Sequence, residues 1–162
     1  IKPAASPKDL KIGLSSKIIF PYFYDDNKLQ RIDEKTLIEK YPGVYSHLSK
    51  YRDKLNKRNS DKSSEWYEFG RSQALNNLNQ KKLLLSFIVT NKIKIYHLNE
   101  EDIPYSGIYI IPKKDKDLDF AKMILESKDF LNYIKEIGIN VSGSSLRITA
   151  NDIKNFDISK WR

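Results

Sequence analysis

The sequence predicts an α+β fold, in which a mixed or antiparallel sheet is flanked by helices in a single domain with an N-terminal arm. Two observations carry this prediction. Apolar residues recur at helical spacing in residues 33–55 and 117–137, and short strand-like runs lie before and between these segments. A chain of 162 residues, 40% of them hydrophobic, is long enough for one folding unit with a buried core.

The first third of the chain predicts an arm, a strand and two helices. Residues 1–16 contain prolines, serines and Gly13 without sustained periodicity, which is typical of a linker or an ordered N-terminal arm. The domain itself is expected over residues 17–162 and begins with a strand-like run, residues 17–24, that Pro21 interrupts. A turn follows at 25–27, and from Asp33 the pattern is helical. Pro42 is expected in the first turn of a second, longer helix.

The remainder predicts strands and then helices. Residues 82–89 and 93–98 have strand patterns separated by a turn at 91–92, which indicates a hairpin, and residues 105–111 predict a third strand. Asp117 and Ser127 are expected to cap two helices, the second of which ends at Gly138. A last strand is expected over 145–149, with a short helical turn from Asn151.

Charge and composition limit the classes of partner. The chain has 29 lysines and arginines against 21 acidic residues, a net charge of +8, which favours a nucleic acid, an anionic membrane surface or an acidic protein. It has no cysteine, which excludes disulfides, thiolate metal sites and cysteine nucleophiles. The longest apolar run, Leu83–Val89, is too short to cross a bilayer, so no membrane span is expected, and a membrane is not among the expected partners. The chain begins without methionine and has no signal-type segment, and we expect a cytoplasmic fragment of a longer protein.

No residue pattern predicts catalysis or metal binding in this chain. His47 and His97 lie far apart without a ligand cluster, so no metal is expected. Asp119, Glu126 and Lys128 superficially match the acid, acid and lysine set of magnesium-dependent nucleases. That set should lie on adjacent strands, whereas the spacing here is helical. The glycines stand singly, without a phosphate-binding loop, and no catalytic residue is expected.

One segment interleaves aromatic, amide and basic residues, Trp66–Gln73, with Lys57 and Arg58 before it and Lys81 and Lys82 after it. Arginine forms two hydrogen bonds with guanine, glutamine does so with adenine, and lysines neutralise phosphates, so these residue types suit DNA recognition. An alternative remains open at this point. Trp66 and Phe69 could instead anchor a loop to the core while Arg71 pairs with an acid.

Several motifs, in order and spacing, resemble the C-terminal target-recognition (specificity) domain of gamma-class N6-adenine DNA methyltransferases of type II and fused type IIG restriction-modification systems. The match covers about residues 17–158. The matching segments are Tyr41–Pro42, Tyr45–Leu48, Leu55–Arg58, Trp66–Gln73, Ser106–Ile111, Lys122–Ser127, Leu146–Ile148 and Asn151–Ile153. One departure is Phe156–Ile158, where the family usually has an aliphatic residue followed by proline.

The resemblance implies DNA recognition and not methyl transfer by this chain. In the family, a preceding catalytic domain binds S-adenosylmethionine and holds the flipped adenine with an Asn-Pro-Pro-aromatic motif, which this sequence lacks. The expected partners are therefore double-stranded DNA and the catalytic domain of the same parent chain, and no cofactor is expected here. The expected DNA-binding residues are Lys57, Arg58, Trp66, Tyr67, Arg71, Ser72, Gln73, Lys81, Lys82, Ser144 and Arg147.

Other interpretations remain open. The chain could be half of a type I specificity subunit, although no long helical spacer is evident. It could also be an RNA-binding or protein-interaction module with a basic surface. Whether the parent also cleaves DNA, and which base sequence is recognised, do not follow from these residues, because small changes in a loop redirect the same side chain to a different base.

Overall fold

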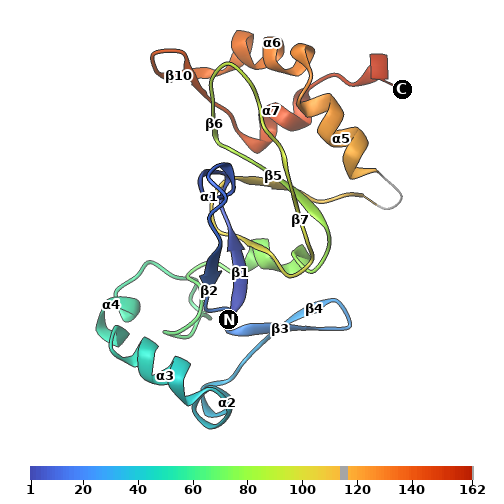
Figure 1. Ribbon diagram of the computed structural model, residues 1–162. Coiled ribbons are helices and arrows are strands. Elements are labelled where there is room, and N and C mark those ends of the chain that lie inside the picture. The colour runs from blue at the N-terminus through green and yellow to red at the C-terminus, as the bar shows by residue number, and fades with distance from the viewer. Residues whose placement is uncertain (114–116, 162) are drawn as a thin grey trace. The chain divides into compact units, whose positions relative to one another are not determined.

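The computed structural model describes residues 1–113 and 117–161, and it confirms the predicted α+β class with mixed and antiparallel strands (Figure 1). Contacts divide the chain into two compact units. Unit 1 comprises residues 1–2 and 17–79, and unit 2 comprises residues 3–16 and 80–162. Strands β1 (Lys2–Ala5) and β2 (Ser16–Ile18) lie where the chain passes from one unit to the other.

Unit 1 opens with a hairpin of β3 (Tyr22–Asp25) and β4 (Lys28–Arg31), in which Tyr24 pairs with Leu29. The turn between the strands is the predicted one. Asp26 and Asn27 have φ angles of 45° and 62°, the left-handed conformation that a two-residue hairpin turn requires. This local signal fixes the register of the hairpin.

The helices of unit 1 are α2 (Glu34–Lys40), α3 (Pro42–Ser49), α4 (Arg52–Asn56) and the 3-10 helix η1 (Gln73–Asn77). Asp33 caps α2, because its carboxylate accepts a 2.8 Å hydrogen bond from the Thr36 amide, and Pro42 occupies the first turn of α3 as predicted. The second helix expected from the sequence is divided, however. Tyr51, at φ −114° and ψ 10°, leaves the helical conformation and separates α3 from α4.

The sheet of unit 2 is centred on β5 (Lys82–Leu85), which pairs antiparallel with β7 (Tyr96–Leu98) on one side and β9 (Ile108–Ile110) on the other. The predicted hairpin is present in the β5–β7 pair. The predicted strand 82–89 is nevertheless broken, because β6 (Ile88–Val89) leaves this sheet and pairs with β11 (Ser145–Arg147), next to β10 (Ile139–Ser142). At the break, the Ser86 hydroxyl accepts a 3.0 Å hydrogen bond from the Ile88 amide.

Three helices of unit 2 bury apolar faces against the β5 sheet: α5 (Leu118–Leu125), α6 (Lys128–Ile137) and α7 (Ala150–Asn155), with the 3-10 helix η2 (Ser159–Trp161) at the end. The predicted caps are confirmed. Asp117 accepts a hydrogen bond from the Asp119 amide, Ser127 accepts one from the Phe130 amide, and α6 ends at Gly138. The longest described helix, α6, has 10 residues, so no long spacer helix lies within the described residues.

Residues 3–16 of the segment assigned from the sequence to a linker or ordered arm are an ordered part of unit 2. It contains helix α1 (Pro7–Lys11), and β1 pairs in parallel with β8 (Ile103–Pro104), with Ala4 opposite Ile103. Ala5 is only 4% exposed and packs with Leu84 and Leu98. Residues 3–16 therefore contribute directly to the core of unit 2.

Candidate nucleic-acid interface

The segment predicted to recognise DNA forms a loop of unit 1, residues 57–73, which we call the central loop. One side chain ties its two ends together. The Arg58 guanidinium donates hydrogen bonds to the main-chain carbonyl oxygens of Leu55 (3.0 Å), Trp66 (2.9 Å) and Glu68 (2.8 Å). Arg58 was predicted to contact phosphate. The residue is exposed, but its Nε and Nη2 atoms are bonded within the loop, so we assign it to the structure of the loop and not to the proposed contacts.

At Gly70, the second half of the central loop lies against the first half, at residues 59–61. The Gly70 carbonyl oxygen accepts a 2.8 Å hydrogen bond from the Asp61 amide. A Cβ atom at Gly70 would lie 3.1 Å from the Ser60 hydroxyl and 3.3 Å from the Asn59 carbonyl oxygen, contacts so tight that a larger residue would require these neighbours to shift. The contacts of Gly70 with residues 59–61 therefore close the base of the loop, directly before Arg71.

Trp66 and Tyr67 are core residues, 8% and 5% exposed, and not surface aromatics. The Trp66 indole donates a 3.0 Å hydrogen bond to Glu34, and the Tyr67 hydroxyl donates one of 2.9 Å to the Ile32 carbonyl oxygen. The Arg52 guanidinium lies 4.6 Å from the centre of a Trp66 ring. Both aromatics were predicted to bind DNA. The structure instead agrees with the alternative in which Trp66 anchors the loop, so both leave the proposed contact set.

The central loop contains a buried carboxyl group, that of Glu68, with only 1% of the residue exposed. Its carboxylate accepts a 3.1 Å hydrogen bond from the Glu65 amide and lies 3.6 Å from an Arg31 nitrogen. Burial raises the pKa of Glu68 above its usual range. The next residue is also fixed, because the Phe69 amide donates a 2.9 Å hydrogen bond to the Tyr22 hydroxyl, whose pKa burial raises to about 12.

Arg71, Ser72 and Gln73 follow this anchored stretch and have a different character. Arg71 and Gln73 are exposed, and among the described residues no hydrogen bond or ion pair engages the Arg71 guanidinium. The predicted alternative, in which Arg71 pairs with an acid, is therefore not seen in the described part of the chain. Ser72 is half-buried and precedes η1 without a side-chain capping bond. The loop thus presents two side chains suited to base edges next to a rigid segment.

The predicted phosphate-binding lysines fall into two groups. Lys57 in unit 1 and Lys81 in unit 2 are exposed. Lys82, by contrast, is fully buried, and its ammonium group donates hydrogen bonds to the carbonyl oxygens of Gln80 (2.9 Å) and Asn99 (2.6 Å). Burial lowers its pKa to about 8. Lys82 is removed from the contact set because its ammonium group is buried and bonded to the main chain. The basic neighbours of Lys82 in the sequence did not reveal this burial.

Ser144 and Arg147 lie in unit 2 and are exposed. Ser144 follows Gly143, which has a φ of 55° in the turn between β10 and β11. Arg147 ends β11 and lines a hollow of about 470 Å³ together with Phe87 and Lys154. The structure thus brings the central-loop residues together in unit 1, and places Lys81, Lys82, Ser144 and Arg147 in unit 2.

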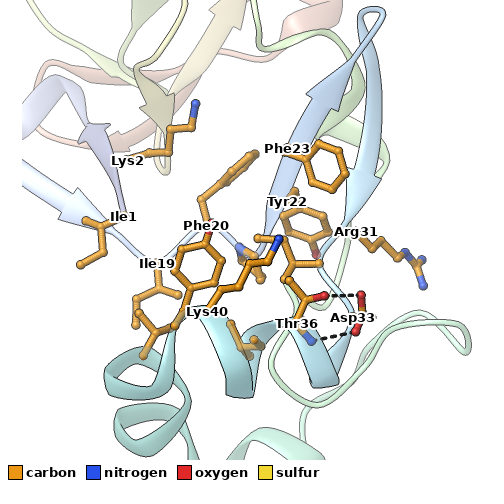
Figure 2. A pocket seen from close by; sticks show the side chains of 15 residues that line it. Ile1, Lys2, Ile19, Phe20, Tyr22, Phe23, Arg31, Asp33, Thr36 and Lys40 are labelled. Carbon is orange, nitrogen blue, oxygen red and sulfur yellow. Dashed lines mark hydrogen bonds between the residues drawn. The ribbon is translucent and has the colours of Figure 1, made fainter.

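Unit 1 contains a cavity of about 540 Å³ that the sequence patterns did not indicate, and its walls include Phe20, Leu37 and Val44 (Figure 2). Its one carboxylate is already used in local structure. Figure 2 shows Asp33 turned toward Thr36, to which it is joined by hydrogen bonds of 2.8 Å and 2.7 Å. The lining therefore combines apolar walls and cationic side chains, without the paired acids or nucleophile and base that hydrolytic chemistry requires.

Among the described residues, the groups considered for nuclease or metal chemistry do not gather into one site. Asp119 is 81% exposed on α5 and lies 3.1 Å from His97, while His47 on α3 packs against the Tyr51 ring. Glu126 ends α5, where it accepts hydrogen bonds from the Ile95 amide and from Lys122. Within residues 1–113 and 117–161, no three metal-binding side chains cluster. Nor does any helix in that part of the chain have the length and apolar character needed to cross a membrane.

Comparison with known proteins gives two partial matches, and no protein-family model matches the chain. Over 110 residues, 62% of this chain, it is 30% identical to the type II methyltransferase M.MjaIV of Methanocaldococcus jannaschii, 36% of which is covered. Over 99 residues, 57% of this chain, it is 31% identical to the type II restriction enzyme and methyltransferase RM.Eco57I of Escherichia coli, 10% of which is covered. Part of the chain is therefore similar to methyltransferases of restriction-modification systems, and the chain spans only a minor part of each relative.

Proposed function

We propose that this chain is the sequence-specific DNA-recognition domain of an adenine-specific DNA methyltransferase of a restriction-modification system. In this proposal it holds duplex DNA for a catalytic domain elsewhere in the same parent protein. The similarity to two type II methyltransferases supports the enzyme class, and the net charge of +8 supports a polyanionic partner.

The observation that carries the proposal is the contrast within the central loop. Trp66, Glu68 and Phe69 are fixed by buried contacts, while Arg71 and Gln73 immediately after them are exposed. A guanidinium group matches the two acceptors of guanine in the major groove, and a carboxamide matches the acceptor and donor of adenine. Side chains mounted on a rigid segment lose less conformational freedom on binding, so this arrangement favours base reading over non-specific contact.

Lys57 and Lys81 are the proposed phosphate contacts that remain from the sequence prediction, and Ser144 and Arg147 remain as exposed contacts of unit 2. Lysines at phosphates bind any duplex and fix its position, because they displace condensed counterions without reading bases. Lys50, directly after α3, and Lys54, on α4, are exposed too and would extend this basic surface.

The methyl donor is proposed to bind outside this chain. The six glycines stand singly, and an Asn-Pro-Pro-aromatic motif is not present in the sequence. The cavity of unit 1 contains Asp33, but the hydrogen bonds to Thr36 already use this carboxylate. S-adenosylmethionine would accordingly be held by the catalytic domain, and this chain would contribute DNA position and sequence selection.

The proposal is tested by duplex binding and sequence selection with the chain, Arg71→Ala, Arg71→Lys and the exposed-loop control Lys62→Ala. Wild type should bind duplex with an affinity that falls as salt rises, and selection from random-sequence duplexes should enrich a preferred site. Arg71→Ala should cost about 1–3 kcal/mol on that site alone, and Arg71→Lys should keep the charge but lose the two-bond geometry.

Two results would reject this function. One is preferential binding of single-stranded DNA or RNA over duplex in direct competition, which would indicate a different nucleic-acid class. The other is an Arg71→Ala variant that melts several degrees lower but selects the same site as wild type. In that case Arg71 would be a structural residue and base reading would lie elsewhere.

A further inference from the structure

A second basic surface lies in unit 2, in a cleft of about 420 Å³ that the sequence patterns did not single out. Four of the side chains that line it are lysines, two from α1 and two from the segment between β6 and β7: Lys8, Lys11, Lys92 and Lys94. We call this the lysine cleft. All four lysines are exposed, and the hydroxyl residues Ser86 and Thr90 also line it.

The α1 wall of the lysine cleft is held by a buried carboxylate. Asp9 is 7% exposed and accepts hydrogen bonds from the Ser16 hydroxyl (2.8 Å) and from the Tyr105 hydroxyl. The Ser6 side chain caps the helix by accepting a 3.1 Å hydrogen bond from the Asp9 amide. Because residues three apart share one helix face, Lys8 and Lys11 project from an anchored turn.

The opposite wall is set by strict alternation in the sequence. Ile93 and Ile95 are 6% and 2% exposed and belong to the core of unit 2, which leaves Lys92 and Lys94 on the outer face. Lys94 is positioned further, because its ammonium group lies 4.9 Å from the centre of the Tyr96 ring. Both walls therefore present cations from segments that packing holds in place.

The charge of the lysine cleft is not neutralised within the described structure. Its lining includes no carboxylate, and among the described residues no ion pair joins any of the four lysines to an acid. The residue next to Lys8 in sequence is Asp9, whose buried carboxylate is bonded to Ser16 and Tyr105 and forms no ion pair with Lys8 in the described structure. Four positive charges around one hollow repel each other unless an anion enters it.

The chemistry of the lining favours the backbone of a duplex over unpaired bases. Lysine is a compact point charge that suits phosphate oxygens, and hydroxyl groups add neutral donors. Binding of a single strand requires open aromatic faces on which bases stack. The one aromatic ring of the lining, Tyr96, has the ammonium group of Lys94 over it.

We infer that the lysine cleft of unit 2 binds the phosphodiester backbone of duplex DNA. This inference rests on the proposed function and adds to it a named site in the second unit. It makes unit 2 contribute affinity without sequence selection, while the central loop of unit 1 contributes selection.

The test compares three double variants of the full chain that remove the same charge. Lys8→Gln with Lys11→Gln and Lys92→Gln with Lys94→Gln alter the two walls. Lys128→Gln with Lys135→Gln is the matched control on exposed positions of α6. Fluorescence anisotropy with a labelled duplex is measured between about 50 and 200 mM salt, and melting temperatures establish that each variant is folded.

Each cleft variant should lower the slope of log affinity against log salt by about two, because each lost phosphate contact contributes about 0.9. The fall in affinity across this salt range should shrink roughly tenfold, and the selected base sequence should not change. The control variant should keep the wild-type slope. These results together would support the lysine cleft as a phosphate site.

Failure of the inference and failure of the proposed function give different results. If wild type shows no salt-dependent duplex binding, both are rejected. If Arg71→Ala loses sequence selection while both cleft variants keep the wild-type slope, only the lysine cleft is rejected. The same holds if the α6 control loses as much slope as the cleft variants, or if the cleft variants lose RNA binding and retain duplex binding.

Discussion

The Arg58 guanidinium donates a 2.8 Å hydrogen bond to the main-chain carbonyl oxygen of Glu68, ten residues along the chain. It also donates a hydrogen bond to the Trp66 carbonyl oxygen. One side chain therefore closes the part of the central loop that precedes the proposed base-reading residues. Lys57, its neighbour, is exposed and makes no such contact in the described structure. Two adjacent basic residues therefore have different roles, and substitution should separate them.

Arg58→Ala should reduce the free energy of unfolding by about 1–3 kcal/mol, since it leaves three carbonyl oxygens without their charged donor. Lys57→Ala should change stability by less than about 0.5 kcal/mol and lower the salt slope of duplex binding by about one. Urea denaturation and anisotropy measure the two effects. Equal loss of stability in both variants would contradict the assigned roles.

Trp66→Ala should be the most destabilising change in the core of unit 1, by about 3–5 kcal/mol, because it removes a buried indole and leaves a cavity. Trp66→Phe should cost less, since it keeps a ring but loses the 3.0 Å hydrogen bond to Glu34. Thermal unfolding of both variants gives the comparison. If Trp66→Ala kept the wild-type melting temperature and lost only DNA binding, the indole would be a contact residue after all.

Gly107→Ala should be far more disruptive than Gly143→Ala, although both glycines have positive φ angles, 101° and 55°. At Gly107 a Cβ atom would lie 2.6 Å from the Leu85 carbonyl oxygen and 2.9 Å from a Pro7 carbon, whereas at Gly143 nothing lies within 4 Å. We expect about 1–2 kcal/mol of backbone strain at Gly143 and a larger loss at Gly107, where steric overlap adds to it. Similar melting temperatures for both variants would be inconsistent with this packing.

The stability of the chain should depend on pH through Lys82, whose pKa burial lowers to about 8. In the unfolded chain this lysine titrates near 10.4, so between about pH 8 and pH 10 the unfolded state binds more protons than the folded state. Stability should therefore rise with pH across this window, relative to Lys82→Met. Urea denaturation from pH 7 to pH 10 measures the difference, with Lys81→Met as the exposed control. A wild-type minus Lys82→Met difference that does not change with pH would contradict it.

The sequence by itself determined the features that depend on a few neighbouring residues. The Asp33, Asp117 and Ser127 caps and the turn at Asp26 follow from hydrogen bonds and backbone angles within about one turn of chain. The α+β class and the candidate segment for DNA recognition were also read from local periodicity and residue type. Arg71 and Gln73, which the sequence assigned to DNA binding, are exposed in the structure, and their contacts to DNA are part of the proposed function.

Tertiary structure decided which basic and aromatic residues are available to a partner. In the sequence, Lys82, Trp66 and Arg58 stand among basic and aromatic residues of the kind found on DNA-binding surfaces. In the structure, the side chain of each one is hydrogen-bonded to another residue of the chain. The partners of Lys82 and Trp66 lie 17 and 32 residues away, Asn99 and Glu34. In the same way, β6 leaves the β5 strand to pair with β11, a segment more than 50 residues downstream. Burial and pairing depend on distant chain segments meeting in space, so residue type and local spacing cannot report them.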